Sequence, residues 1–181
     1  MIKSPLLCHA STQPQDAYQL TVTVTPLPEG AVQLCYHLTG DVAQLLLPER
    51  LPPRATDGLW QHTCFEAFVA VQGETRYHEF NFSPATQWAA YAFSDTRQRC
   101  PWLAEQAPPI TLTQTAASVT IDTLIHAVNL PPNPTGKPLQ LGLTAVLETL
   151  NGHLSYWALH HPALYPDFHD HAGFILTLNP P

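Results

Sequence analysis

The chain has 181 residues, of which 45% are apolar and 12% are charged, and its formal net charge is −7. This length suits one domain over residues 1–181 with a substantial core. A negative chain without a basic stripe is a poor partner for nucleic acid, and no apolar run approaches the ~20 residues that span a bilayer. The first nine residues do not resemble a signal peptide, so we expect a cytoplasmic protein with reduced thiols.

Alternation of apolar and polar residues predicts strands along most of the chain. Nineteen prolines, about twice the usual share, favour short strands separated by turns. Asn151-Gly152 suits a two-residue type I′ hairpin turn. In chain order, strands are expected at 20–25, 32–38, 42–47, 63–71, 76–82, 87–93, 110–114, 117–122, 139–149, 153–158 and 174–178, with 94–109 irregular apart from one helical turn at 102–106. About ten strands predict an all-β fold, an antiparallel β-sandwich or jelly roll.

Three of these strands carry a carboxylate among apolar neighbours. Glu66 shares a face with Cys64 and Phe68, Glu79 shares a face with Asn81, and Glu148 lies opposite the leucine face of its strand. If the strands are neighbours in one sheet, these side chains form a polar patch on a rigid floor. The alternative is an ordinary solvated sheet face.

Two tryptophans lie next to loops, where an indole can stack on a sugar ring. Trp60 ends a proline-rich loop just before a strand, and Trp157 ends a strand just before another loop. Core packing is the alternative for both, because indoles bury well when their N–H finds a partner. For Trp88 and Trp102 packing in the core or under a loop is the stronger expectation.

Histidine is concentrated near the end of the chain, where five of the ten histidines fall within residues 153–171. Imidazole and carboxylate are good ligands for transition metals, so His169, His171 and Asp167 are candidate metal ligands, although their spacing matches no recognised metal site. Hydrogen bonds within the loop, or to a ligand hydroxyl, are the alternatives. The usual nucleophile and phosphate-loop motifs are missing. The other catalytic option is that Glu66 and Glu79 form the acid–base pair of a glycosidase.

Several segments resemble the DOMON-like proteins akin to carbohydrate-binding module family 9. They are Leu-Trp-Gln-His-Thr-Cys-Phe-Glu-Ala-Phe at 59–68, Tyr-His-Glu-Phe-Asn-Phe-Ser-Pro at 77–84 and Gln-Trp-Ala-Ala-Tyr at 87–91. Ser-Tyr-Trp-Ala-Leu-His-His-Pro at 155–162 and Pro-Asp-Phe-His at 166–169 resemble the closing signature of one bacterial branch. The resemblance covers residues 18–178 and implies a β-sandwich.

Sugar-binding members of that family hold a terminal sugar between two tryptophans, which the resemblance assigns to Trp60 and Trp157. Glu66 matches the acid that binds sugar hydroxyls, and Glu79 and Asn81 match a polar pair on the next strand. Glu79 departs from the pattern, because sugar-binding members carry a basic residue there. His160, His161 and His169 are further candidate ligand-binding residues that would be particular to this branch.

Other DOMON relatives bind haem through Met and His, but the one methionine here is Met1, so only a bis-histidine haem site would remain. We therefore expect no cofactor. The sequence predicts a non-catalytic domain that binds a sugar or a similar small polyhydroxylated ligand. The alternatives are a metal-dependent or acid–base enzyme using the C-terminal His/Asp cluster, and a protein-interaction module.

Overall fold

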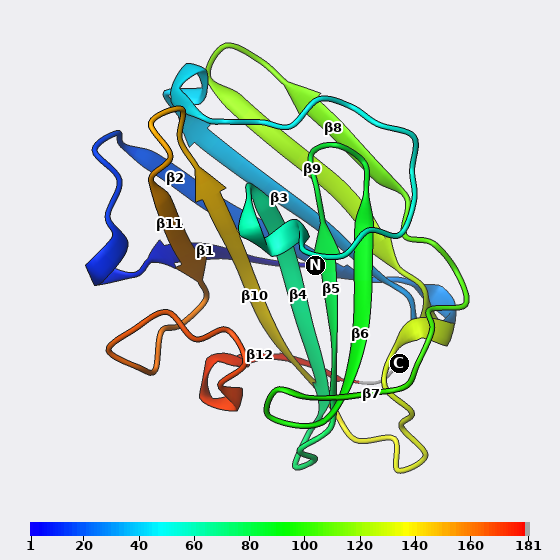
Figure 1. The fold of residues 1–181 in the computed structure, drawn as a ribbon. Helices are drawn as coiled ribbons and strands as arrows, with labels where there is room; N and C mark the ends of the chain where they lie inside the picture. The colour runs from blue at the N-terminus through cyan, green and yellow to red at the C-terminus, as the bar shows by residue number, and fades with distance from the viewer. Residues whose placement is uncertain (180–181) are drawn as a thin grey trace.

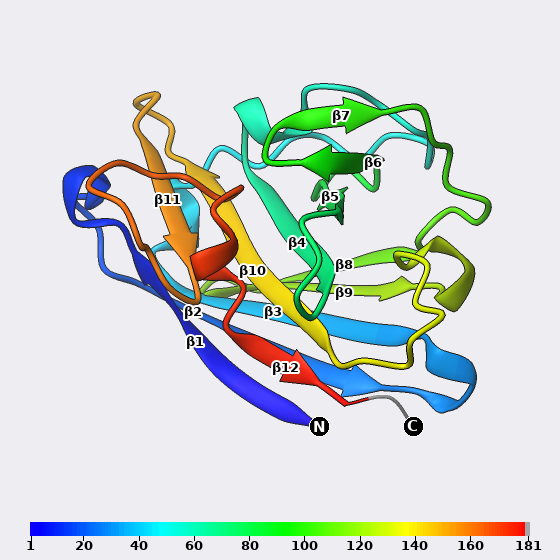
Figure 2. The same cartoon turned by 90° about the horizontal axis from the view of Figure 1, so that it is seen from below.

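The computed structural model describes residues 1–179, and its strands form two antiparallel sheets that pack face to face (Figures 1 and 2). Sheet A has the order β1 (Ile2–Cys8), β2 (Tyr18–Pro26), β3 (Val32–Gly40), β9 (Ser118–Ile125) and β8 (Ile110–Gln114). Sheet B has the order β7 (Gln98–Cys100), β6 (Trp88–Asp95), β5 (Tyr77–Phe82), β4 (Cys64–Val71), β10 (Leu139–Glu148) and β11 (Leu154–Ala158). The last strand, β12 (Leu176–Leu178), pairs with the start of β10. The predicted all-β antiparallel sandwich is confirmed.

Strand β1 belongs to both sheets, because its first residues pair with β2 whereas Leu7 and Cys8 pair with β11. This strand was not predicted from the sequence. Only Leu6 of β1 is buried, so the alternation that marks a half-buried strand is lacking.

The main core lies between the sheets and is built from the inward-facing residues of both. Leu34 and Leu38 of sheet A and Phe65 and Phe80 of sheet B are among its most buried members. Tyr36 crosses this core, and its hydroxyl donates to the backbone oxygen of Glu66 at 2.7 Å. The two sheets are therefore fixed to each other by a polar contact as well as by apolar packing.

Some predicted elements differ from the structure. Residues 42–47 form no strand, because the short 3-10 helix η3 (Val42–Gln44) occupies the first half of the run and only Leu45 forms a bridge, to Thr149. Residues 102–106 form no helical turn, whereas β7 lies inside the stretch expected to be irregular. The other helices are η1 (Ala10–Thr12), η2 (Pro28–Gly30), η4 (Leu59–Gln61), η5 (Ala127–Asn129) and η6 (His171–Gly173). Among residues 1–179, none of the helices has the length and apolar character to cross a bilayer.

The β10–β11 hairpin forms as predicted, but with a different turn that shifts its register. A two-residue turn at Asn151-Gly152 would pair Val146 with Trp157. The loop instead has three residues between Thr149 and His153, with a positive φ at Gly152 and not at Asn151. Val146 therefore pairs with Tyr156. Because side chains alternate across a strand, this shift of one residue turns Trp157 into the core and Tyr156 to the outer face of sheet B.

The outer face of sheet B is partly covered by a second, smaller core. Phe68, Tyr77 and Phe93 project from β4, β5 and β6 and pack with Phe174, which precedes β12. Gly142 of β10 makes room for this cover, since a Cβ there would lie 2.5 Å from the Phe174 ring. All residues of β4 and β5 are consequently buried, whichever face they occupy.

The hairpin register predicts a large difference between two neighbouring aromatic residues. Trp157→Ala should lower the free energy of unfolding by about 3–5 kcal/mol, because it empties a core position. Tyr156→Ala should lower it by about 1 kcal/mol or less, because that side chain is only half-buried. Urea denaturation followed by circular dichroism measures both, and equal losses or the reverse order would contradict the register.

Candidate functional site

A cavity of about 530 Å³ opens on the outer face of sheet B, beside the second core. Its floor is formed by side chains from five neighbouring strands, and its rim by three segments: η4, the β6–β7 hairpin and the chain after β11. The floor residues are Glu66, Phe68, Glu79, Tyr91, Val146 and Tyr156. The rim residues include Trp60, Arg97, Arg99, Phe168 and His169.

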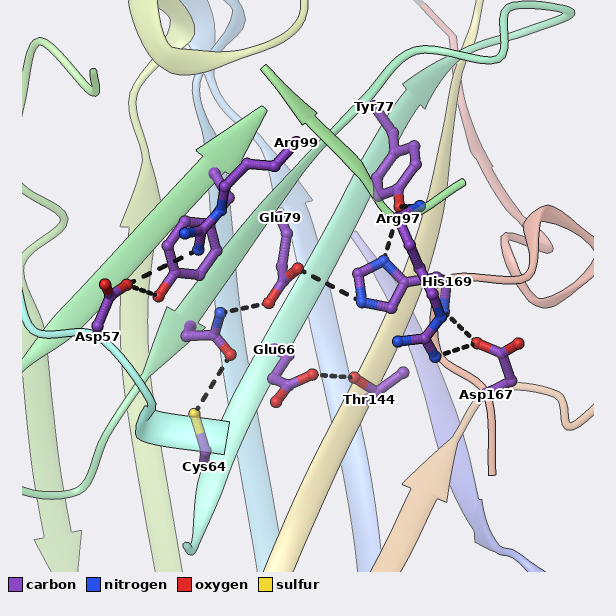
Figure 3. A network of polar contacts seen from close by, with 12 residues as sticks. Asp57, Cys64, Glu66, Tyr77, Glu79, Arg97, Arg99, Thr144, Asp167 and His169 are labelled. Atoms are coloured by element: carbon purple, nitrogen blue, oxygen red, sulfur yellow. Dashed lines mark hydrogen bonds and ion pairs between the residues drawn. The ribbon is translucent and has the colours of Figure 1, made fainter. Parts of the chain in front are cut away.

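Strand pairing brings two of the three predicted carboxylates together on the floor. Glu66 lies opposite Asn81 of β5 and Thr144 of β10, and Glu79 projects from the same face of β5 (Figure 3). Glu148 lies on this face too, but at the end of β10, where its Oε2 is 2.7 Å from Nδ1 of His62. The predicted acidic face is therefore present, and the cavity uses Glu66 and Glu79.

Glu66 is the most deeply buried polar group of the floor, with 2% of its surface exposed. Thr144 donates to its Oε2 at 3.3 Å, whereas Oε1 is buried without a hydrogen-bond partner among residues 1–179. Burial, and then the nearby Glu79, raise the pKa of the Glu66 carboxyl well above its usual value, and the Thr144 contact opposes this only in part. The environment thus favours the protonated form, which offers both a donor and an acceptor.

Glu79 is held by a polar neighbour on its own strand. The side-chain amide of Asn81 donates to Glu79 Oε1 at 2.6 Å. Burial raises the pKa of Glu79, while the Asn81 contact and the positive charges of Arg99 and Arg97 act in the opposite direction. Asn81, predicted as a ligand-binding residue, is fully buried and does not line the cavity, so its side chain positions Glu79 instead.

His169 lies at the rim, with its two ring nitrogens facing different groups (Figure 3). Nδ1 is 2.6 Å from the hydroxyl of Tyr77, and Nε2 is 3.8 Å from Glu79 Oε2. The Tyr77 hydroxyl also accepts the backbone N–H of Arg97 at 3.1 Å. Burial, and then the charge of Arg97, lower the pKa of His169 to about 4, so the imidazole is neutral near pH 7.

Two arginines of the β6–β7 hairpin complete the rim. Arg97 donates to Asp167 at 2.8 Å and so connects the hairpin to the chain after β11. The Arg99 guanidinium stacks 3.5 Å above the ring of Tyr91, whose hydroxyl donates to Asp57 at 2.5 Å. The Arg97 guanidinium thus lies beside Asp167 and the Arg99 guanidinium beside Asp57. These carboxylates limit how strongly the two arginines attract an anion.

The predicted pair of tryptophan walls does not form. Trp60 lines the cavity and is 49% exposed, as an accessible stacking surface should be. Trp157 is 6% exposed, packs in the main core and donates through Nε1 to Ser155 at 2.9 Å. The expectation for Trp157 was wrong because of the hairpin register, and Tyr156 and Phe168 line the cavity instead.

The other C-terminal histidines do not join this site. His160 is exposed and does not line the cavity, and His161 bonds the backbone oxygen of Leu7 at 2.8 Å. His171 packs against the rings of Phe174 and Tyr77 and does not line the cavity. Over residues 1–179, no three His, Cys, Asp or Glu side chains are grouped so that they could hold a metal. Within this part of the chain, the candidate metal ligands His169, His171 and Asp167 are therefore not grouped around a common centre.

Comparisons with known proteins show the fold. The crystal structure of a "putative carbohydrate-binding protein" from Bacteroides uniformis superposes with a TM-score of 0.67. The match covers 97% of this chain and 84% of that protein, at 15% sequence identity. No family model and no curated protein matches the sequence.

Sequence reasoning missed several residues of the site. Tyr77 and Tyr91 could have been found, because alternation places them on the same face as Glu79. Arg97 and Arg99 lie in the stretch expected to be irregular, and Phe168 follows the last sheet-B hairpin, so no periodic pattern marks them. Their place at the rim depends on contacts between segments far apart in the chain.

The raised pKa of Glu66 predicts a pH-dependent cost in stability. As pH rises, the unfolded chain ionises Glu66 before the folded protein does, so the folded state loses stability relative to a variant that cannot ionise. The melting temperature of Glu66→Gln minus that of the wild type should therefore increase by about 3 °C or more between about pH 5 and about pH 8. Scanning calorimetry measures this difference, in which the histidine titrations common to both proteins cancel.

The matched control is Glu49→Gln, at an exposed position. The difference in melting temperature between this variant and the wild type should stay nearly constant over the same pH range. A constant difference for Glu66→Gln as well would contradict the buried, proton-favouring environment.

Proposed function

We propose that the chain acts as one non-catalytic domain that binds a sugar or a similar small polyhydroxylated ligand in the cavity of sheet B. The observation that carries this proposal is the placement of an accessible indole, Trp60, beside two buried carboxyl groups, Glu66 and Glu79, around one hollow. Aromatic faces pack against the apolar faces of sugar rings, while carboxyl groups bond their hydroxyls.

The size of the hollow supports a small ligand. Pockets for small molecules commonly enclose about 300–1,000 Å³, and this one encloses about 530 Å³. A protein-interaction module would be better served by a flat, open face. The charges also suit an uncharged ligand, because each rim arginine already lies beside Asp167 or Asp57.

The fold shared with a "putative carbohydrate-binding protein" supports the same ligand class. We infer a relationship to the DOMON-like proteins akin to carbohydrate-binding module family 9, in which one of the two tryptophans that hold the sugar is replaced by other aromatic residues. Trp60, Glu66 and Glu79, which the resemblance assigns to ligand binding, all line the cavity, and in this proposal Tyr156 and Phe168 supply the aromatic surface expected of Trp157. Where the family pattern has a basic residue, this chain has Glu79. Arg97 and Arg99 of the β6–β7 hairpin line the cavity instead.

Isothermal titration with a panel of neutral mono- and disaccharides tests the proposal. We expect at least one sugar to bind, and Trp60→Ala to weaken that binding about fivefold or more, because one aromatic contact contributes about 1 kcal/mol. Tyr165→Ala is the control, since Tyr165 is exposed and does not line the cavity. Absence of binding at millimolar concentrations across the panel, or equal losses in the two variants, would contradict the proposal.

A further inference from the structure

We propose that His169 and Glu79 form a donor–acceptor pair that recognises one hydroxyl group of the ligand, and that Tyr77 sets the tautomer of His169 that makes this recognition work. The inference rests on the proposed function and deepens it, because it names the ligand group that the site selects. Tyr77 is a positioning residue in this account, since it does not line the cavity.

The spacing of the two groups leaves room for one ligand oxygen between them. His169 Nε2 and Glu79 Oε2 are 3.8 Å apart, which is too long for a direct hydrogen bond. A hydroxyl oxygen can lie about 2.8 Å from both atoms, accepting from the nitrogen and donating to the carboxylate. Both side chains line the cavity, so a ligand inside it reaches them.

Tyr77 decides which ring nitrogen carries the proton. Its hydroxyl already accepts the backbone N–H of Arg97, and its oxygen is 2.6 Å from His169 Nδ1. If Tyr77 donates to Nδ1, the imidazole proton is on Nε2 and points toward Glu79. In the other tautomer Nδ1 would donate, and the buried Tyr77 proton would lose its acceptor. An Nε2 lone pair would then also face the Glu79 carboxyl, which is unfavourable when that group is ionised.

Each member of the arrangement is held in place before a ligand arrives. The Tyr77 ring stacks on the Phe93 ring, with 4.7 Å between the ring centroids and an angle of 5° between the ring planes. Asn81 fixes the other oxygen of Glu79, and the backbone N–H of His169 donates to Asp167 at 3.1 Å. Because these groups are already fixed, little ordering is needed when a hydroxyl binds.

The pair distinguishes a hydroxyl from its common replacements. A hydroxyl both accepts and donates, so it satisfies His169 and Glu79 together. Fluorine and a methoxy oxygen offer no donor to Glu79, an ammonium offers no acceptor to His169, and a deoxy carbon offers neither. An analogue altered at the recognised position leaves at least one buried group unpaired, which is the strongest basis for rejecting it.

The tautomer is tested without any ligand. Long-range ¹H–¹⁵N NMR of the histidine rings, with His169 assigned from the signals that disappear in His169→Gln, should show the proton on Nε2 in the wild type. Tyr77→Phe, which keeps the ring and removes the hydroxyl, should produce a mixture of the two tautomers. Tyr18→Phe is the matched control, because the Tyr18 hydroxyl bonds Asp41 on another part of the molecule. A proton on Nδ1 in the wild type, or an unchanged ring in Tyr77→Phe, would overturn the assignment.

The hydroxyl recognition is tested with deoxy, deoxyfluoro and amino analogues of the best-binding monosaccharide, one ring position at a time. We expect one position at which all three analogues bind at least tenfold more weakly than the parent. At that position the penalties should shrink severalfold in His169→Phe. Similar small penalties at every position would overturn the pair while leaving sugar binding intact. Absence of binding for every sugar would overturn the proposed function and the hydroxyl recognition together, whatever tautomer the NMR spectra show.

Discussion

Burial of strands β4 and β5 on both faces of sheet B is the constraint on which the site depends. The inner face of this sheet packs against sheet A, and its outer face is covered in part by Phe174 and the second core. Strands β4 and β5 consequently have no residue directed into open solvent, although they carry Glu66, His78, Glu79 and Asn81. Polar groups in such strands must be paired with one another or left for a ligand.

Not every buried polar atom on the cavity floor has a hydrogen-bond partner among residues 1–179. Asn81 satisfies one oxygen of Glu79 and Thr144 one oxygen of Glu66, whereas Glu66 Oε1 has no partner within residues 1–179. Buried polar atoms without partners are rare in stable folds and are concentrated at functional sites. The same outer face that supplies these groups also carries Tyr91, Val146 and Tyr156, so polar and apolar surfaces face one hollow. This combination favours a ligand with both hydroxyl groups and apolar ring faces.

The sequence alone predicted the strands and side-chain faces that depend on strict alternation of apolar and polar residues. It failed at the β10–β11 hairpin, where one extra loop residue changes the strand pairing. The strands around Glu66 and Glu79 and the face that each side chain occupies were found, because a period of two is readable over six or more residues. The turn at Asn151-Gly152 was found too, but not its three-residue loop, so Trp157 was assigned to the wrong face. Strand β1 and the arginines of the β6–β7 hairpin carry no periodic signal. The role of the segment after β11 could not be predicted either, since only tertiary packing places Phe168 and His169 over sheet B.

The central claim is that the hollow on the outer face of sheet B is where this protein binds its ligand. A crystal structure of the protein with a bound sugar tests this most directly. The account predicts the sugar ring against Trp60, with its hydroxyls directed at Glu66, Glu79 and His169. A sugar bound elsewhere, with this hollow left empty, would contradict it.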